Sequence, residues 1–216
     1  MKVSPAKENI LKRVRNALSQ PVPLPFPQAE RQQPVFPAPT GGLEELFAQS
    51  FAALKGRFVF CAHHQDVADA LSALAANEQW ENCYCRELPL LHQLEPFDLP
   101  FLNRGADLGQ ADAGLTSCEA LVARTGSVLI SAAQPSGRSV GIFPPVHLVI
   151  AYIDQLVYDI PDAFGLLQTH YPDNLPSMVS LQSGPSRTSD IEKTSVIGVH
   201  GPAEVYVFLV DEPSGL

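Results

Sequence analysis

Apolar residues recur at helical spacing near the start of the chain. They follow Ser4 and Pro5, which suit the cap and the first turn of a helix. The apolar stripe consists of Ile10, Leu11, Val14, Ala17 and Leu18, and the basic residues beside it are Lys7, Lys12, Arg13 and Arg15. The pattern predicts a basic amphipathic helix. Such a helix can dock on the acidic remainder of the chain, on a neighbouring subunit or on a partner, whereas a membrane surface is less favoured because no large aromatic residue anchors it.

Seven of the residues from 21 to 40 are proline. Proline lacks a backbone donor and cannot continue a helix or join a central strand, so we expect an extended strap or linker here. We therefore predict two parts: residues 1–40, with the helix and the Pro-rich strap, and an α/β domain of residues 41–216.

From residue 43 onward, helical and strand-like patterns alternate. Helices are predicted over residues 43–54, 66–74 and 161–167, and a capping-box pattern at Thr116 predicts another short helix that runs through Val122. Strands are predicted over residues 57–61, 82–88, 127–130, 146–150, 178–181 and 204–210. This alternation predicts an α/β fold with a mostly parallel sheet and helices on both faces.

Charge and hydropathy narrow the functional classes. The chain has 216 residues and a net charge of −9. Residues 1–40 carry six Lys or Arg against two acids, whereas residues 41–180 carry six against sixteen, so the body lacks the basic face that nucleic acid binding requires. No apolar run approaches the roughly 20 residues of a membrane span, and the N-terminus does not resemble a secretory signal. A cytoplasmic protein is expected.

The cysteines indicate free thiols in a reducing compartment. Cys61, Cys83, Cys85 and Cys118 form no C-x-x-C motif and no spacing typical of zinc or an iron–sulfur cluster, so we expect no metal site. The adjacent histidines at 63–64 have two interpretations, a pair of metal ligands or the polar edge of a loop. His147, inside an apolar run, is either a core histidine or a catalytic base.

Small residues, hydroxyls and charges concentrate between residues 183 and 202. Gly184 permits close backbone approach, and Ser186, Thr188 or Ser189 can cap a helical turn whose N–H groups face an anion. Arg187 would add a planar donor suited to phosphate or carboxylate. The alternative is an ordinary turn in which Arg187 pairs with Asp190 or Glu192. The spacing does not decide between the two.

Several motifs, taken in order, resemble a known family. They lie at residues 111–116 and 123–127, at Gly137 and Arg138, at residues 143–147, and at residues 183–192 and 198–202. Together they resemble the LUD domain, specifically the lactate utilization protein C family, over most of residues 43–210. The basic N-terminal helix also resembles the opening segment of that family. One departure is Arg124, where the family pattern has an acidic residue before Thr-Gly.

The resemblance implies a fold similar to the phosphosugar-isomerase and CoA-transferase-like group. It also implies a role in lactate catabolism, the oxidation of L-lactate to pyruvate, beside partner proteins that carry iron–sulfur clusters. This chain lacks the cysteine runs that such clusters require, so we expect no cofactor on it and place the clusters on the partners. Whether the chain forms a homo-oligomer is left open.

Two hypotheses follow from the resemblance and the loop. The first is a non-redox subunit that binds a small anionic ligand and docks on the iron–sulfur partners. The second is an independent enzyme for a phosphorylated or CoA-linked molecule, with Asp190, Glu192 or His200 as the candidate catalytic residues. In both, the predicted ligand-binding residues are Thr125, Gly126, Gly137, Arg138, Ser183, Gly184, Ser186, Arg187, Thr188, Gly198, His200 and Gly201.

Overall fold

The computed structural model describes residues 5–19, 36–37, 39, 41–105, 107–188 and 196–214. Contacts divide the chain into two compact units, Met1–Ala38 and Pro39–Leu216. The first unit contains α1 (Pro5–Leu18), the predicted N-terminal helix, none of whose residues is buried. Ser4 and most of the predicted strap lie outside the described residues.

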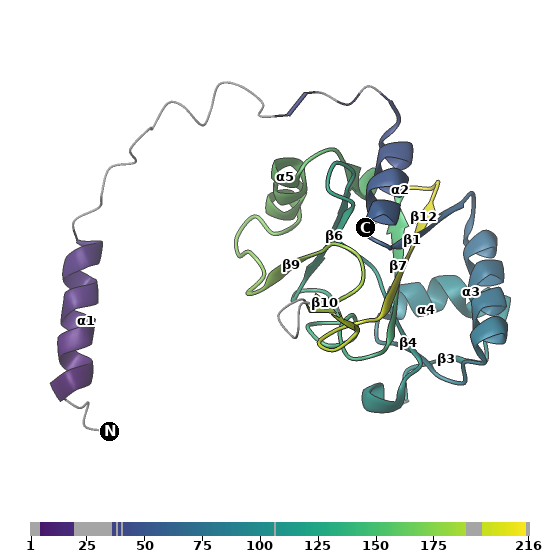
Figure 1. Ribbon diagram of the computed structural model, residues 1–216, viewed down its shortest axis with the longest axis horizontal. Coiled ribbons are helices and arrows are strands. Elements are labelled where there is room, and N and C mark those ends of the chain that lie inside the picture. The colour runs from purple at the N-terminus through teal and green to yellow at the C-terminus, as the bar shows by residue number, and fades with distance from the viewer. Residues whose placement is uncertain are drawn as a thin grey trace. The chain divides into compact units, whose positions relative to one another are not determined.

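The second unit alternates helices and strands along the chain (Figure 1). Among the described residues its helices are α2 (Leu43–Ala53), α3 (His64–Glu78), α4 (Leu88–Leu94) and α5 (Ile160–His170), with short 3-10 helices at Glu95–Phe97, Leu108–Gln110 and Ile153–Gln155. Its strands are β1 (Arg57–Cys61), β2 (Cys83–Cys85), β3 (Leu102–Asn103), β4 (Ala113–Thr116), β5 (Ala120–Val122), β6 (Ser127–Ser131), β7 (Val146–Tyr152), β8 (Leu156–Val157), β9 (Val179–Gln182), β10 (Arg187–Thr188), β11 (Val196–Ile197) and β12 (Glu204–Val210).

Six strands form a parallel sheet in the order β1-β12-β7-β4-β2-β3. Strands β7 and β12 lie inside it and pair from Val146 opposite Glu204 to Tyr152 opposite Val210. Both are almost continuously apolar, as expected for strands that are covered on two faces. The predicted α/β fold with a mostly parallel sheet is confirmed.

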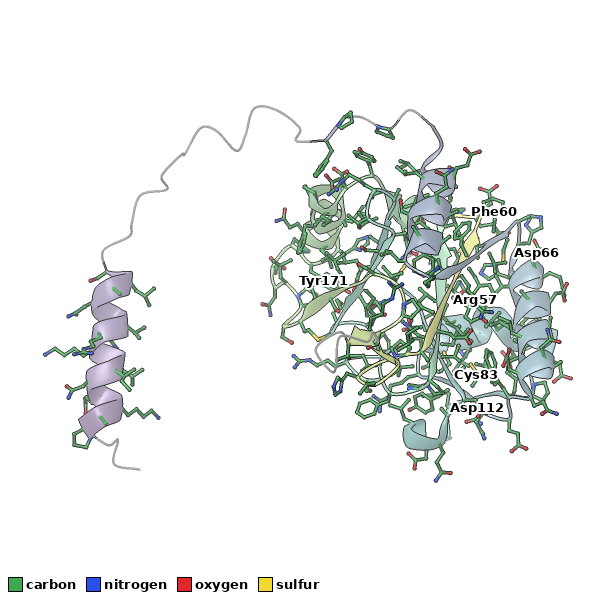
Figure 2. The ribbon with its side chains drawn as sticks, viewed as in Figure 1. Arg57, Phe60, Asp66, Cys83, Asp112 and Tyr171 are labelled. Atoms are coloured by element: carbon green, nitrogen blue, oxygen red, sulfur yellow. The ribbon has the colours of Figure 1, made fainter. Side chains whose placement is uncertain are left out.

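Two cores cover the faces of this large sheet. The first lies against α3 and α4 and includes Leu71, Leu90, Cys83 and Phe208; Figure 2 shows Cys83 beside these helices. The second core packs α2, through Phe47 and Phe51, together with a smaller sheet against the other face. Figure 1 shows α3 and α4 on one side of the large sheet, and β6, β9 and α5 on the other.

The smaller sheet has the order β8-β5-β6-β9 and was not predicted as a separate layer. Its centre is the antiparallel hairpin β5–β6, in which Leu121 pairs with Val128. The short helix predicted from Thr116 through Val122 is therefore wrong. Residues 120–122 are extended because they pair with β6 across the turn at Thr125 and Gly126, and the Glu119 N–H donates to the Leu129 carbonyl, 2.8 Å away, instead of starting a helix.

The described residues contain no helix that is both long and apolar enough to cross a membrane. The same residues contain no cluster of three or more His, Cys, Asp or Glu side chains arranged to hold a metal ion.

Candidate functional site

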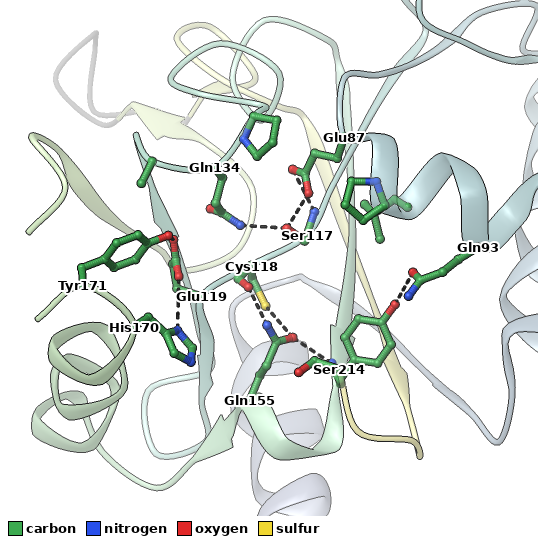
Figure 3. A pocket seen from close by; sticks show the side chains of 15 residues that line it. Glu87, Gln93, Ser117, Cys118, Glu119, Gln134, Gln155, His170, Tyr171 and Ser214 are labelled. Atoms are coloured by element: carbon green, nitrogen blue, oxygen red, sulfur yellow. Dashed lines mark hydrogen bonds and ion pairs between the residues drawn. The ribbon is translucent and has the colours of Figure 1, made fainter. Parts of the chain in front are cut away.

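A cavity of about 380 Å³ opens at the carboxyl edge of the large sheet (Figure 3). Four parallel strands, β2, β4, β7 and β12, each lead into a segment that lines it. Ligands of open α/β sheets bind outside this edge. The lining residues are Glu87, Pro89, Leu90, Gln93, Ser117, Cys118, Glu119, Ala133, Gln134, Pro135, Tyr152, Gln155, His170, Tyr171 and Ser214.

Glu87, which follows β2, is a buried carboxylate with three donors. The backbone N–H of Ser117 donates to its Oε1 at 3.2 Å, and the Ser117 hydroxyl donates to its Oε2 at 2.5 Å. The hydroxyl of Ser136 also donates to Oε1. Only 4% of Glu87 is exposed, so these bonds replace water around a buried charge.

Glu119, between β4 and β5, is the second buried carboxylate, and 5% of it is exposed. Its Oε1 accepts the Ser131 hydroxyl at 2.5 Å and the Tyr171 hydroxyl at 3.1 Å. Its Oε2 lies 3.8 Å from Nδ1 of His170, the last residue of α5. Figure 3 shows Tyr171 and His170 on either side of Glu119. Burial and, next, the Glu119 charge raise the pKa of Tyr171, which therefore stays a neutral donor.

Gln155 lines the pocket and joins the segments that follow β7 and β4. Its Oε1 accepts the Tyr152 backbone N–H at 3.0 Å and its Nε2 donates to the Cys118 carbonyl at 2.7 Å, so the amide orientation is determined. Burial raises the pKa of the Cys118 thiol well above its usual value. That thiol is therefore protonated near neutral pH and poorly suited to act as a nucleophile.

Tyr152 connects the pocket to the adjacent histidines, His63 and His64. Its hydroxyl donates to Oε1 of Gln93 at 2.6 Å and lies 3.1 Å from Nε2 of His64. His63 and His64 each place Nδ1 near a Glu212 oxygen, at 2.9 and 3.2 Å. His63 is the N-cap of α3 and His64 is its first residue, so the pair lies at a helix start, and the choice between metal ligands and a polar edge stays open.

Comparison with known proteins identifies the fold family. A model of the LUD domain matches residues 71–210. The chain belongs to the LUD domain family. The matched range includes every lining residue of the pocket except Ser214.

Proteins of similar sequence include three whose names are lactate utilization protein C or C 1. The protein from Bacillus velezensis is 32% identical over 105 residues, 48% of this chain and 44% of its own length. The protein from Deinococcus radiodurans is 32% identical over 106 residues, 49% of each. A third, lactate utilization protein C 1 from Bacillus mycoides, is 34% identical over 104 residues, 47% of this chain and 44% of its length. The alignments thus span about half the length of these curated relatives.

A solved structure shows the same fold. The crystal structure of a DUF162 family protein from Deinococcus radiodurans superimposes with a TM-score of 0.60, covering 81% of this chain and 99% of that chain. The sequence identity is 17%, so the likeness concerns the fold alone.

Four of the predicted ligand-binding residues, Gly126, Ser183, Gly184 and Arg187, lie at or next to the end of α2. The Ser127 and Ser183 hydroxyls are 2.7 Å apart. Gly126 and Gly184 have φ of 58° and 78°; a Cβ on Gly126 would meet the Phe51 nitrogen at 2.6 Å, and one on Gly184 the Leu54 carbonyl oxygen at 2.7 Å. Both glycines are therefore required by close packing against α2.

Arg187 has a structural partner at the same place. Its Nη2 donates to the Leu54 carbonyl, the C-cap of α2, where the partial negative charge of the helix end favours a cation. Arg187 and Thr188 form β10, which pairs with β11, so these two residues are extended. Ser189 lies outside the described residues.

The remaining predicted residues divide into three groups. Ser186, Gly198 and Gly201 are close together: the Gly198 N–H donates to the Ser186 carbonyl at 3.0 Å, and a Cβ on Gly201 would meet the Ser186 Cβ at 3.0 Å. His200 is exposed. Gly137 and Arg138 lie apart from these, in the loop after β6, where Arg138 donates to the Ser177 hydroxyl at 2.9 Å. The candidate catalytic residues Asp190 and Glu192 lie outside the described residues.

The pocket and the predicted loop lie at opposite edges of the large sheet. Ser186 donates its N–H to Pro202, just before β12 begins, whereas the pocket residue Ser214 follows the end of β12. A seven-residue strand spans about 23 Å. Within the described chain, none of the predicted ligand-binding residues lines the pocket.

Arg124, the residue that departs from the family pattern, forms an ion pair. Its Nη2 donates to Oδ1 of Asp159 at 2.6 Å, and Asp159 is the N-cap of α5. That hydrogen bond, more than any other contact, lowers the pKa of Asp159. The positive charge at this position therefore joins the β5–β6 turn to α5.

Proposed function

We propose that this protein is a component of an L-lactate utilization system. In the proposal it is a non-redox subunit that binds a small anionic ligand and docks on partner proteins that carry iron–sulfur clusters. The observation that carries the proposal is 30–34% identity, over about half the chain, to proteins named lactate utilization protein C. Membership of the LUD domain family supports it.

The partners supply the redox centres in this proposal because the sequence contains no cysteine run typical of a cluster. The exposed stripe of α1, with Ile10, Leu11, Val14 and Leu18, offers a surface for docking on a partner. The protein works in the cytoplasm in the same proposal.

Growth tests the role. Deletion of the gene in its native host should abolish growth on L-lactate as the only carbon source and leave growth on pyruvate unchanged, because the block lies before pyruvate. The full-length gene should restore growth. Normal growth of the deleted strain on L-lactate, with no second copy of the gene, would contradict the role.

Binding tests the anionic ligand and its site. Among the described residues Arg187 donates through Nη2 to the Leu54 carbonyl, and the guanidinium has further donors, so we propose the anion beside it and the hydroxyls of Ser183 and Ser186. A ligand at 100 times its dissociation constant stabilises the folded state by about 2.7 kcal/mol. Thermal shift with L-lactate, pyruvate and inorganic phosphate should show this for the wild type.

Two substitutions of Arg187 are needed to separate a loss of anion binding from a loss of stability. Arg187→Ala loses the contact to α2 as well as the anion donor, so its own melting temperature should fall. Arg187→Lys keeps the charge near the end of α2 but loses the planar pair of donors. The site would be refuted if both folded variants bound each anion as tightly as the wild type.

The pocket favours a second candidate function, that of an independent enzyme on a phosphorylated or CoA-linked small molecule. The pocket contains two buried glutamates, one of which, Glu119, lies beside His170, and these are side-chain types used in acid–base catalysis. Because the lining contains no Lys or Arg, the phosphate of such a substrate would lie outside the cavity. Turnover of sugar phosphates or CoA esters by the purified chain, lost in Glu119→Gln, would support the enzyme, and absence of turnover would leave the subunit role preferred.

A further inference from the structure

The direction of the hydrogen bonds at Glu87 is fixed by the backbone. The Ser131 N–H must donate, and it does so to Oε1 of Gln134 at 3.0 Å. Therefore Nε2 of Gln134 faces the Ser117 hydroxyl, 2.9 Å away, and donates to it. The Ser117 hydrogen is then directed to Glu87. Glu87 accepts the hydrogen bonds that Ser117 and Ser136 make to it.

The same argument applies to Glu119. The Ser131 hydroxyl accepts the Ala133 N–H at 3.1 Å and donates to Oε1 of Glu119. The Tyr171 hydroxyl donates to that same oxygen. Glu119 is thus a second hydrogen-bonded carboxyl group on the pocket wall, and Ser131, Gln134 and Ser117 join it to Glu87.

One carboxylate oxygen has acceptor capacity left for a ligand. Oε1 of Glu119 accepts two hydrogen bonds, whereas the partner of Oε2 among the described residues is Nδ1 of His170, at an ion-pair distance of 3.8 Å that is too long for a hydrogen bond. The Glu119 side chain is 6% exposed and lines the cavity. A carboxylate oxygen at a cavity wall that accepts no hydrogen bond from the described residues can accept one from a ligand.

The charge of the lining sets the class of that ligand. The fifteen lining residues include Glu87 and Glu119 but no Lys or Arg, and His170 is the one side chain among them that can carry a positive charge. A carboxylate or phosphate in this cavity would meet two like charges. Hydroxyl and amine groups would instead donate to Oε2 of Glu119.

We propose that this pocket is a binding site for a small neutral or cationic molecule that donates a hydroxyl or amine hydrogen to Glu119, and that it excludes anions. This site is separate from the anion site proposed beside Arg187, at the other edge of the sheet. It does not depend on the role in lactate utilization.

Three probes with the same hydroxylated three-carbon skeleton test the charge preference: L-lactate, L-lactamide and 1-amino-2-propanol, with charges of −1, 0 and +1. Each is titrated into the full-length ¹⁵N-labelled protein, and the backbone amide signals of Ser117 and Glu119 report on the pocket. We expect 1-amino-2-propanol and lactamide to shift these signals with dissociation constants at least about tenfold below that of lactate. Lactate bound at the Arg187 site would instead shift signals around residues 183–188.

Two variants locate the source of the preference. Glu119→Gln keeps the size of the side chain and removes its charge, so the preference should fall to within about threefold. Glu45→Gln removes one exposed carboxylate outside the pocket and should leave the preference unchanged. The proposal is overturned if lactate binds at Ser117 and Glu119 as tightly as the other two, if neither of those two shifts the signals, or if Glu119→Gln keeps the full preference. The comparison on the wild type decides the matter alone if Glu119→Gln does not fold.

Discussion

Gly126 and Gly137 have nearly the same backbone conformation in different surroundings. Their φ angles are 58° and 61°, in the left-handed region that costs other residues about 1–2 kcal/mol. A Cβ on Gly126 would lie 2.6 Å from backbone atoms of α2, whereas a Cβ on Gly137 would have no atom within 4 Å. The two positions therefore separate backbone strain from steric conflict.

Gly137→Ala should lower the free energy of unfolding by about 1–2 kcal/mol, the cost of the conformation alone. Gly126→Ala should lower it by at least about 2 kcal/mol more, because α2 must move away from the new methyl group. Urea denaturation of both variants measures the difference. Equal losses would show that the contact with α2 is unimportant.

His147 lies on the second-core side of β7 and is fully buried. Its Nε2 is 2.9 Å from the Thr116 hydroxyl, and a Cβ on Gly141 would lie 2.8 Å from the ring. Burial, opposed by a contact with Gln182, lowers the pKa of His147 from 6.5 to about 4. The side chain is therefore neutral at pH 7, which supports the interpretation as a core histidine.

This depressed pKa predicts a pH dependence of stability. Between pH 6.5 and 4 the unfolded chain binds a proton at His147 that the folded chain does not, so the free energy of unfolding falls as the pH falls. The slope is about 1.4 kcal/mol per pH unit and the total about 3 kcal/mol. In His147→Gln this part of the slope should vanish. Urea titrations of both proteins across this range provide the measurement, and parallel curves would contradict the prediction.

The candidate pocket was not predicted, and the reason is visible in its residues. Glu87 and Glu119 are single acids without a motif, 32 positions apart, and they meet because β2 and β4 are neighbouring parallel strands. The sequence did contain one indication, because each glutamate follows a short strand, and the carboxyl ends of parallel strands meet at one edge of the sheet. The residues at 183–201 attracted attention by composition, but Gly184 and Arg187 among them contact the end of α2. Their role in binding stays a prediction.

At the scale of elements, the sequence pattern correctly predicted helices and strands whose conformation follows from their own residues. The helices predicted at 43–54, 66–74 and 161–167 correspond to α2, α3 and α5, and the strands predicted at 57–61, 146–150 and 204–210 to β1, β7 and β12. The strand predicted at 82–88 is shorter because Pro89 sits in the first turn of α4. The error at 116–122 has a different cause, since its extended form depends on pairing with β6 and β8.

Helix α5 illustrates how one side chain joins two elements. Asp159 accepts the Ile160 N–H at 2.6 Å as the N-cap, and it accepts the Arg124 guanidinium from the β5–β6 turn. Replacement by alanine should lower the free energy of unfolding by about 1–2 kcal/mol, because both contacts are lost. Asp159→Asn keeps a capping oxygen and should cost less. Chemical denaturation compares the two, and an equal loss would mean that the cap contributes nothing.

At the scale of the whole chain, α1 and the α/β domain form separate compact units. Residues 39–216 contain the α/β core as a compact unit of their own. Removal of residues 1–38 should leave the melting temperature of residues 39–216 unchanged within measurement error. Calorimetry of the full and shortened chains provides the test, with the circular dichroism spectrum as a control for the lost helix. A clearly lower melting temperature of the shortened chain would show that α1 supports the domain.

The four cysteines divide between the two cores that cover the large sheet. Cys61, Cys83 and Cys85 belong to the core under α3 and α4, and Cys118 belongs to the core shared with α2 and the smaller sheet. Burial raises the pKa of all four, to about 11 for Cys61 and about 12 for Cys85. A thiol reagent such as iodoacetamide can therefore modify them only when a core opens. The order in which peptides containing these cysteines become alkylated during gradual denaturation would thus record which side of the sheet comes apart first.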